Sequence, residues 1–223
     1  MIQHYHDERR RKLGFIALTA VVLLVLALAG ITMGAAATGI TDLWAMLRGQ
    51  GDPTKVQIIT HIRLPRVLAA ILAGAALAVS GVVMQSILRN PLGSPFTLGI
   101  SNAAAFGAAF AIVVLGAGST QSQAADAVLL GNAYVVTLSA FIWSLLSTGL
   151  ILAVAKLRGA TPETMILTGI VAGSLFTAGT TALQYFADDV QLSAIVFWTF
   201  GDMGRASWND MWILLAVIAP AMV

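Results

Sequence analysis

The sequence contains no cysteine and few charged residues. The absence of cysteine from all 223 residues excludes a disulfide framework, thiolate metal ligands and a cysteine nucleophile. Only 10% of the residues are charged, whereas soluble domains contain about 25% because a compact fold must present a hydrated surface. The hydrophobic share is 58%. Most of the chain is therefore expected to face lipid or other apolar helices.

The few charges are clustered at the N-terminus, where six are consecutive in residues 7–12. Binding of nucleic acid requires basic residues gathered on a hydrated face, and no other segment of the chain offers such a cluster. The net charge of +2 is correspondingly small. We therefore expect no nucleic-acid partner. The basic cluster instead indicates the orientation of the chain in the membrane.

Long apolar runs fill most of the sequence. A membrane-spanning helix needs about 20 apolar residues. Five complete runs meet that length, namely 13–33, 67–88, 96–115, 133–155 and 165–186. A sixth begins near Trp208, and its apolar part, residues 211–223, is too short to cross a membrane. We expect an N-terminal tail at 1–12, a transmembrane domain at 13–223 and a longer natural protein.

The basic cluster also predicts the orientation of the first span. Residues 9–12 are all basic, and no lysine or arginine follows until Arg48. Cytoplasmic flanks of membrane helices are enriched in lysine and arginine, so the N-terminus is predicted to be cytoplasmic. The apolar run is also longer than that of a signal peptide, about 7–15 residues, which favours a retained span. The chain is thus expected to be a multi-pass protein of the plasma or inner membrane.

Several shorter signals predict where helices begin and end. Ser94-Pro95 and Thr161-Pro162 each resemble a helix cap followed by proline in the first turn. Ser207 with Asp210 three residues later has the pattern of a capping box. A short helix is expected at 43–48, and residues 188–189 are expected to lie in a hydrated loop.

Polar residues inside the predicted spans are uncharged. Such residues usually face a bundle interior or a wet cavity, because unpaired polar groups are costly in hydrocarbon. The fifth span has the most, including Ser174, Thr177 and Thr181, and their hydroxyls could either line a cavity or bond their own helix carbonyls. Gln85 and Asn102 have no such local partner and favour a cavity. No ionisable residue lies mid-span, so a proton relay or a membrane-embedded acid–base enzyme is disfavoured.

The hydrophilic segments show no catalytic pattern. They contain neither a phosphate-binding glycine loop nor a nucleophile elbow with histidine and acid partners. No set of residues has metal-ligand spacing, and no cofactor is expected. Any ATP hydrolysis is expected on a separate subunit.

Residues 61–92, with Arg-Leu-Pro-Arg at their start and Arg-Asn-Pro-Leu at their end, resemble the permeases of FecCD-type ABC importers. The resemblance continues through residues 98–102, 167–169 and 197–204 and covers 10–223. It implies an all-α, polytopic bundle with the type II ABC importer permease fold, with about six of an expected ten helices here. It also implies cytoplasmic ATP-binding subunits, an extracytoplasmic substrate-binding protein, and a second permease copy or a paralogue.

The resemblance further implies roles for particular residues. Arg63 matches an outer-face arginine that binds a glutamate of the binding protein, although Arg63 and Arg66 could instead anchor their helix at the interface. Thr161, Pro162 and Glu163 match the cytoplasmic gate loop, where the family more often has small hydroxyl residues. The path-lining fifth helix of the family supports the cavity interpretation of residues 174, 177 and 181.

The sequence therefore favours a permease for a metal chelate, taken to be a ferric siderophore. Haem and cobalamin permeases of the same family are alternatives, as is a membrane assembly subunit without transport activity. A membrane-embedded enzyme is the least supported class.

Overall fold

The computed structural model describes the whole chain except residues 1, 35, 37, 118–132, 160 and 223. The regular elements of the described residues are all helices, with no strand among them. Contacts divide them into two compact units, residues 1–74 with 203–223, and residues 75–202. Within the described part of the chain, four helical stretches are long and apolar enough to cross a membrane: Glu8–Thr32, Pro53–Leu88, Ala133–Arg158 and Pro162–Phe186. These stretches correspond to four of the five complete spans that the sequence predicts, and the first ends at Thr32, one residue before the predicted end.

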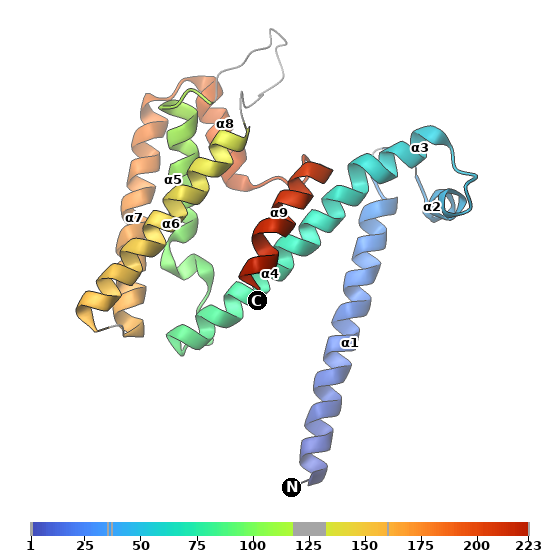
Figure 1. The fold of residues 1–223 in the computed structure, drawn as a ribbon, viewed down its shortest axis with the longest axis horizontal. Coiled ribbons are helices and arrows are strands. Elements are labelled where there is room, and N and C mark those ends of the chain that lie inside the picture. Colours follow the sequence, from blue (N-terminus) through green and yellow to red (C-terminus); the bar gives the residue numbers. More distant parts are fainter. Residues whose placement is uncertain (1, 35, 37, 118–132, 160, 223) are drawn as a thin grey trace. The chain divides into compact units, whose positions relative to one another are not determined.

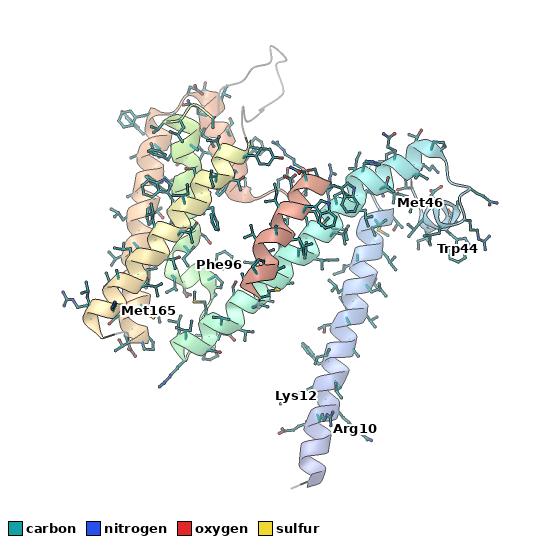
Figure 2. All side chains as sticks on the ribbon, in the orientation of Figure 1. Arg10, Lys12, Trp44, Met46, Phe96 and Met165 are labelled. Carbon is teal, nitrogen blue, oxygen red and sulfur yellow. The ribbon has the colours of Figure 1, made fainter. Side chains whose placement is uncertain are left out.

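The first unit contains α1 (Ile2–Thr32), α2 (Ile40–Leu47), α3 (Pro53–Ile58) and α9 (Trp208–Ala221) (Figure 1). It also contains the first part of α4 (Leu64–Leu88), which continues into the second unit. Figure 2 shows Arg10 and Lys12 toward the N-terminal end of α1, and Trp44 and Met46 on α2 near the other end of α1. The helix α1 already begins at Ile2, so the basic tail is helical.

A π-helical turn, η1 (Ile59–Arg63), joins α3 to α4 without a break. Pro65 explains this turn, because proline has no backbone N–H and cannot continue the regular ladder. The N–H of Leu64 instead donates to the carbonyl of Ile59, five residues earlier. The carbonyl of Thr60 is then available to the indole Nε1–H of Trp208, which donates to it at 2.8 Å. The turn thereby fixes the start of α9 to the start of α4.

The second unit is packed around α5 (Ile100–Val113), which contacts α6 (Ala133–Arg158), α7 (Pro162–Phe186) and α8 (Asp189–Phe200). Figure 1 shows α5 running beside α6 and α7. Small residues permit this packing, since Ala103, Ala109 and Ala111 are fully buried. An ideal Cβ on Gly107 would lie 2.7 Å from the Ser139 carbonyl oxygen, and the Ser139 hydroxyl donates to the Gly107 carbonyl at 2.6 Å.

The structure differs from the sequence prediction at several elements. The predicted span 96–115 is instead a 3₁₀ turn, η2 (Pro95–Leu98), followed by the 14 residues of α5. Residues 188–189, expected in a loop, are the cap and first residue of α8. The short helix predicted at 43–48 begins earlier, at Ile40. The predicted caps at Thr161 and Ser207 are confirmed, because both side chains accept backbone N–H bonds at the starts of α7 and α9.

Candidate functional site

Three glycines bring the start of α5 against the middle of α7. Gly99 joins η2 to α5 and has a φ of 66°, a left-handed conformation that side chains strongly disfavour. An ideal Cβ there would lie 2.6 Å from the Gly169 carbonyl oxygen and 2.7 Å from Gly173 Cα. The same test at Gly169 gives 2.7 Å to Leu98 Cα. The two backbones therefore touch, and only glycine fits between them.

A groove lies along this contact, with a volume of about 600 Å³. Among the described residues that line it, none has a charged side chain. From η2 and the start of α5 come Phe96, Thr97, Gly99 and Asn102, and from α7 come Gly169, Ile170, Gly173, Ser174, Thr177, Ala178 and Thr181. Figure 2 labels Phe96, whose side chain is largely exposed. The surface is thus a mixture of apolar groups, glycine backbone and neutral polar groups.

Four of the residues predicted to line a path meet in this groove: Asn102, Ser174, Thr177 and Thr181. The three hydroxyls donate to the carbonyls of Ile170, Gly173 and Thr177 at 2.9, 2.9 and 3.1 Å. Each hydroxyl is therefore satisfied within its own helix and also lines the cavity. Asn102 joins the two sides of the groove, because its Nδ2 donates to the Gly173 carbonyl at 3.3 Å.

Gln85 lies elsewhere. Its side chain is exposed near the end of α4, and its Nε2 donates to the carbonyl of Pro91 at 3.0 Å. This bond closes the turn that follows α4, and Gln85 does not line the groove. The amide thus has the partner that sequence reasoning could not identify, namely the backbone of the Asn-Pro-Leu turn.

Thr161, Pro162 and Glu163 form the start of α7. The Thr161 hydroxyl oxygen accepts the N–H of Thr164 at 3.3 Å, and Pro162 occupies the first helical turn, where it needs no N–H partner. None of the three lines the groove, which begins nearly two turns further along α7 at Gly169. The residue pattern at 161–163 is therefore explained by the start of α7. A role of these residues in a gate is a separate proposal.

Arg63 occupies the end of the π turn and is only 7% exposed. Its Nη1 donates to the carbonyl of Ile31 at 3.0 Å, and its Nη2 donates to the carbonyl of Ala36 at 2.8 Å. The last carbonyls of a helix lack intrahelical partners and carry partial negative charge, which a cation stabilises. Gly34 leaves the necessary room, because an ideal Cβ there would lie 2.8 Å from Nη2. Arg63 thus holds the end of α1, whereas Arg66 is exposed.

Sequence reasoning missed two features of these sites. It did not connect Trp208 with the π turn, although Pro65 within an otherwise helical run was a visible signal. It also treated Thr97 and Phe96 as part of a span, whereas both line the groove beside Gly99. Among the described residues, no group of three or more histidine, aspartate or glutamate side chains could hold a metal ion.

Comparisons with known proteins agree with the helical architecture. The model of the FecCD transport family matches residues 22–223. A protein of Methanocaldococcus jannaschii, named as an ABC transporter permease, is 45% identical over 221 residues, which cover 99% of this chain and 63% of that protein. The hemin transport system permease protein of Yersinia pestis is 33% identical over 216 residues, covering 97% of this chain and 60% of that protein.

Two further comparisons extend the range of relatives. The vitamin B12 import system permease protein of Escherichia coli O127:H6 is 30% identical over 218 residues, covering 98% of this chain and 61% of that protein. A solved structure, titled as an inward-facing conformation of a metal-chelate type ABC transporter, superposes with a TM-score of 0.66 at 28% identity. That match covers 86% of this chain and 55% of the solved chain.

The present chain therefore spans only about 60% of the length of these curated relatives. The family match nevertheless extends over almost the whole chain. The helical fold also superposes on that of a solved transporter whose sequence is 28% identical. The chain belongs to the FecCD transport family.

Proposed function

We propose that this chain forms part of the permease subunit of an ABC importer that moves a metal chelate inward, and that the chelate is a ferric siderophore. The names of relatives include vitamin B12 and hemin permeases, so cobalamin and haem fit the same fold. The iron chelate is preferred as the commonest substrate class implied by the family resemblance. The N-terminus is proposed to lie in the cytoplasm, on the evidence of residues 9–12.

The groove between η2, α5 and α7 is the observation that carries this proposal. Its neutral lining contains Asn102, Ser174, Thr177 and Thr181 beside glycine backbone. A transport path must let a ligand pass without holding it, and a surface without fixed charges avoids strong ionic binding. We therefore assign these four residues to the translocation path and remove Gln85 from it, because its amide closes the turn after α4.

The partners follow from the family. We propose cytoplasmic ATP-binding subunits, an extracytoplasmic substrate-binding protein, and a second permease copy or paralogue in the lipid bilayer. Thr161, Pro162 and Glu163 are proposed to lie at the cytoplasmic gate. In this assignment the Thr161 cap fixes the start of the first turn of α7.

The direct experiment is reconstitution of the full permease with its ATPase and binding protein in liposomes. A ferric siderophore, haem and cobalamin are each added, and ATP hydrolysis and uptake into the lumen are measured. We expect one chelate to stimulate both. A complex that assembles but neither hydrolyses ATP in response to any chelate nor takes one up would instead support the assembly-subunit alternative.

Docking of the binding protein at Arg63 needs its own test, because the guanidinium is already bonded to two backbone carbonyls. A partner carboxylate would have to approach the remaining N–H groups of a side chain that is only 7% exposed. If Arg63 forms a salt bridge with the binding protein, Arg63→Glu weakens that complex, and the loss shrinks as salt is added. Unchanged affinity would remove the docking assignment.

A further inference from the structure

We infer that the groove selects neutral ligands whose periphery carries N–H or O–H donors, and disfavours ligands that present carboxylate or phosphate groups. This inference rests on the proposed function, since it concerns the ligand that passes through the same groove. It follows from which hydrogens the lining side chains have left to donate.

In the structure, the groove-lining hydroxyls of α7 already use their hydrogens in bonds to carbonyls of their own helix. A hydroxyl has a single donor hydrogen and two lone pairs. Ser174, Thr177 and Thr181 each direct that hydrogen to a carbonyl oxygen of the preceding helical turn, at 2.9, 2.9 and 3.1 Å. Their oxygens therefore present lone pairs to the groove, and a hydroxyl that donates to a ligand must first give up its bond to the helix carbonyl.

The opposite side of the groove is similar. The Thr97 hydroxyl donates to the Ser94 carbonyl at 2.6 Å, and its oxygen accepts the Ser94 N–H at 3.4 Å, which leaves one lone pair to accept a bond from a ligand. Asn102 uses one amide hydrogen on the Gly173 carbonyl. Its Oδ1 and its second amide hydrogen remain, which makes Asn102 the single donor among the polar side chains that line the described groove.

The excess of acceptor oxygens over free donors in the groove discriminates between ligand classes. Carboxylates and phosphates are acceptors, and transfer of an anion from water to a surface whose side chains offer a single free donor is unfavourable. Ligand amides and hydroxyls, in contrast, can donate to the oxygens of residues 97, 174, 177 and 181 and keep their hydrogen bonds. A site built to pair with ligand donors can reject a mismatched analogue strongly, because groups on both sides are then left unpaired.

One feature of the groove acts in the opposite direction. The N-terminus of α5 adjoins the groove at Gly99, and helix N-termini carry partial positive charge. The N–H groups of Asn102 and Ala103 are already bonded to the Gly99 carbonyl, at 3.1 and 3.2 Å. The dipole acts only over the first turn, whereas the acceptor oxygens extend along α7 as far as Thr181.

The test uses matched chelates that differ only in amide and carboxylate groups. One pair is cobalamin and the derivative in which a peripheral primary amide is hydrolysed to a carboxylic acid. A second pair is haem and the derivative in which both propionates are converted to amides. A third pair is a ferric siderophore with a carboxylate that does not bind the iron and the derivative in which that carboxylate is an amide, because a ferric siderophore is the proposed substrate. Uptake of all six is measured with the full permease, ATPase and binding protein in liposomes, and within each pair the rates are expressed as an amide-to-acid ratio.

We expect a ratio of about tenfold or more in favour of the amide form in each pair that is transported. Because the binding protein also selects ligands, the decisive readout is how groove variants change the ratio. Thr177→Val with Ser174→Ala removes two acceptors and should lower the ratio severalfold. Thr180→Val is the matched control, because its hydroxyl makes the same bond one turn back, to Phe176, but lies outside the groove.

A second variant keeps the test decisive if the double variant does not assemble. Thr181→Lys places a donor-bearing cation at an exposed position of the groove, and it should raise uptake of the acid forms. An equal ratio in wild type and both variants, or faster uptake of the acid forms by wild type, would overturn the inference while leaving the transporter proposal intact. If no chelate stimulates ATP hydrolysis or uptake, the proposed function fails, and the inference fails with it.

Discussion

Gly99 determines how closely the start of α5 approaches α7. Its positive φ disfavours any side chain, and an ideal Cβ at this position would also lie 2.6 Å from the Gly169 carbonyl oxygen. Neither feature tolerates a side chain, and the second involves backbone that cannot rotate away. The floor of the groove therefore depends on Gly99, as it does on Gly169 and Gly173, and none of the three contributes a side chain.

Gly99→Ala should destabilise the permease by at least about 1–3 kcal/mol, the usual cost of a left-handed non-glycine residue, with the backbone clash in addition. Gly149→Ala on α6 is the matched control, because nothing lies within 4 Å of its ideal Cβ and its φ is ordinary. Alanine is the better helix former, so that variant should be neutral or slightly stabilised. The measurement is the apparent melting temperature of the purified full permease, and equal effects of the two substitutions would contradict the account.

Arg63 has an intramolecular role that does not depend on any partner. Its two bonds fix the carbonyls of Ile31 and Ala36 to the π turn. Hydrogen bonds to a charged group contribute about 1.5–3 kcal/mol, and an unpaired buried carbonyl is costly. This single side chain is therefore expected to determine the order of the last turn of α1.

Arg63→Gln should accelerate amide hydrogen exchange at residues 29–34 in the isolated permease, without any binding protein present. Arg66→Gln changes the formal charge equally but alters an exposed side chain, and it should leave the exchange unchanged. Slow exchange in both variants would show that α1 is held by other contacts.

At the scale of elements, the predictable helices are those whose start signals and apolar length agree. The helix α7 begins with the Thr161 cap and a proline in its first turn, and it is 25 residues long. It ends at Phe186, where the sequence predicts its end. The sequence does not predict α8, because its 12 residues are too few for a span and the charged pair at 188–189 predicts a hydrated loop. The spacing of Asp188 and Gln191 was the available signal, since it has the form of a capping box.

Asp188→Ala should fray the start of α8, because the side chain accepts the Gln191 N–H at 2.7 Å and Gln191 bonds back to the Asp188 N–H. Loss of such a cap costs about 1 kcal/mol. Asp188→Asn retains the capping oxygen and should restore most of the stability. Hydrogen exchange at residues 189–192 reports the effect, and identical exchange in the two variants would show that the cap is dispensable.

The link between α2 and α3 should depend on pH. Lys55 Nζ lies 2.8 Å from Asp42 Oδ1, and this bond, with a second from the Gly39 N–H, lowers the pKa of Asp42 below its ordinary value of 3.8. A lowered carboxyl pKa gives stability that is complete above the unfolded pKa and is lost as pH falls through the folded one. The start of α2 should therefore be equally protected from hydrogen exchange at pH 5 and 7, and less protected below the ordinary pKa. Asp42→Asn should abolish that dependence.

At the scale of the whole molecule, the low charge content predicted both the membrane class and the character of the groove. The absence of mid-span ionisable residues required no knowledge of the fold, and Asn102 and residues 174, 177 and 181 do meet in one uncharged groove. The approach of Gly99 to α7 depends on which helices pack together, so it was not predictable from periodicity. The local partner of Gln85, the Pro91 carbonyl, depends instead on the conformation of the turn after α4, which the Asn-Pro-Leu pattern does not specify.

The central claim, that the groove beside α7 is the path of the chelate, is tested most directly by thiol labelling at Thr177. These 223 residues contain no cysteine, so Thr177→Cys introduces a single thiol into this part of the permease. In the reconstituted transporter, a membrane-impermeant thiol reagent should modify it and block uptake, and the transported chelate should slow the modification. Thr180→Cys, which is buried outside the groove, should show neither effect. Full uptake after complete modification of residue 177 would contradict the account.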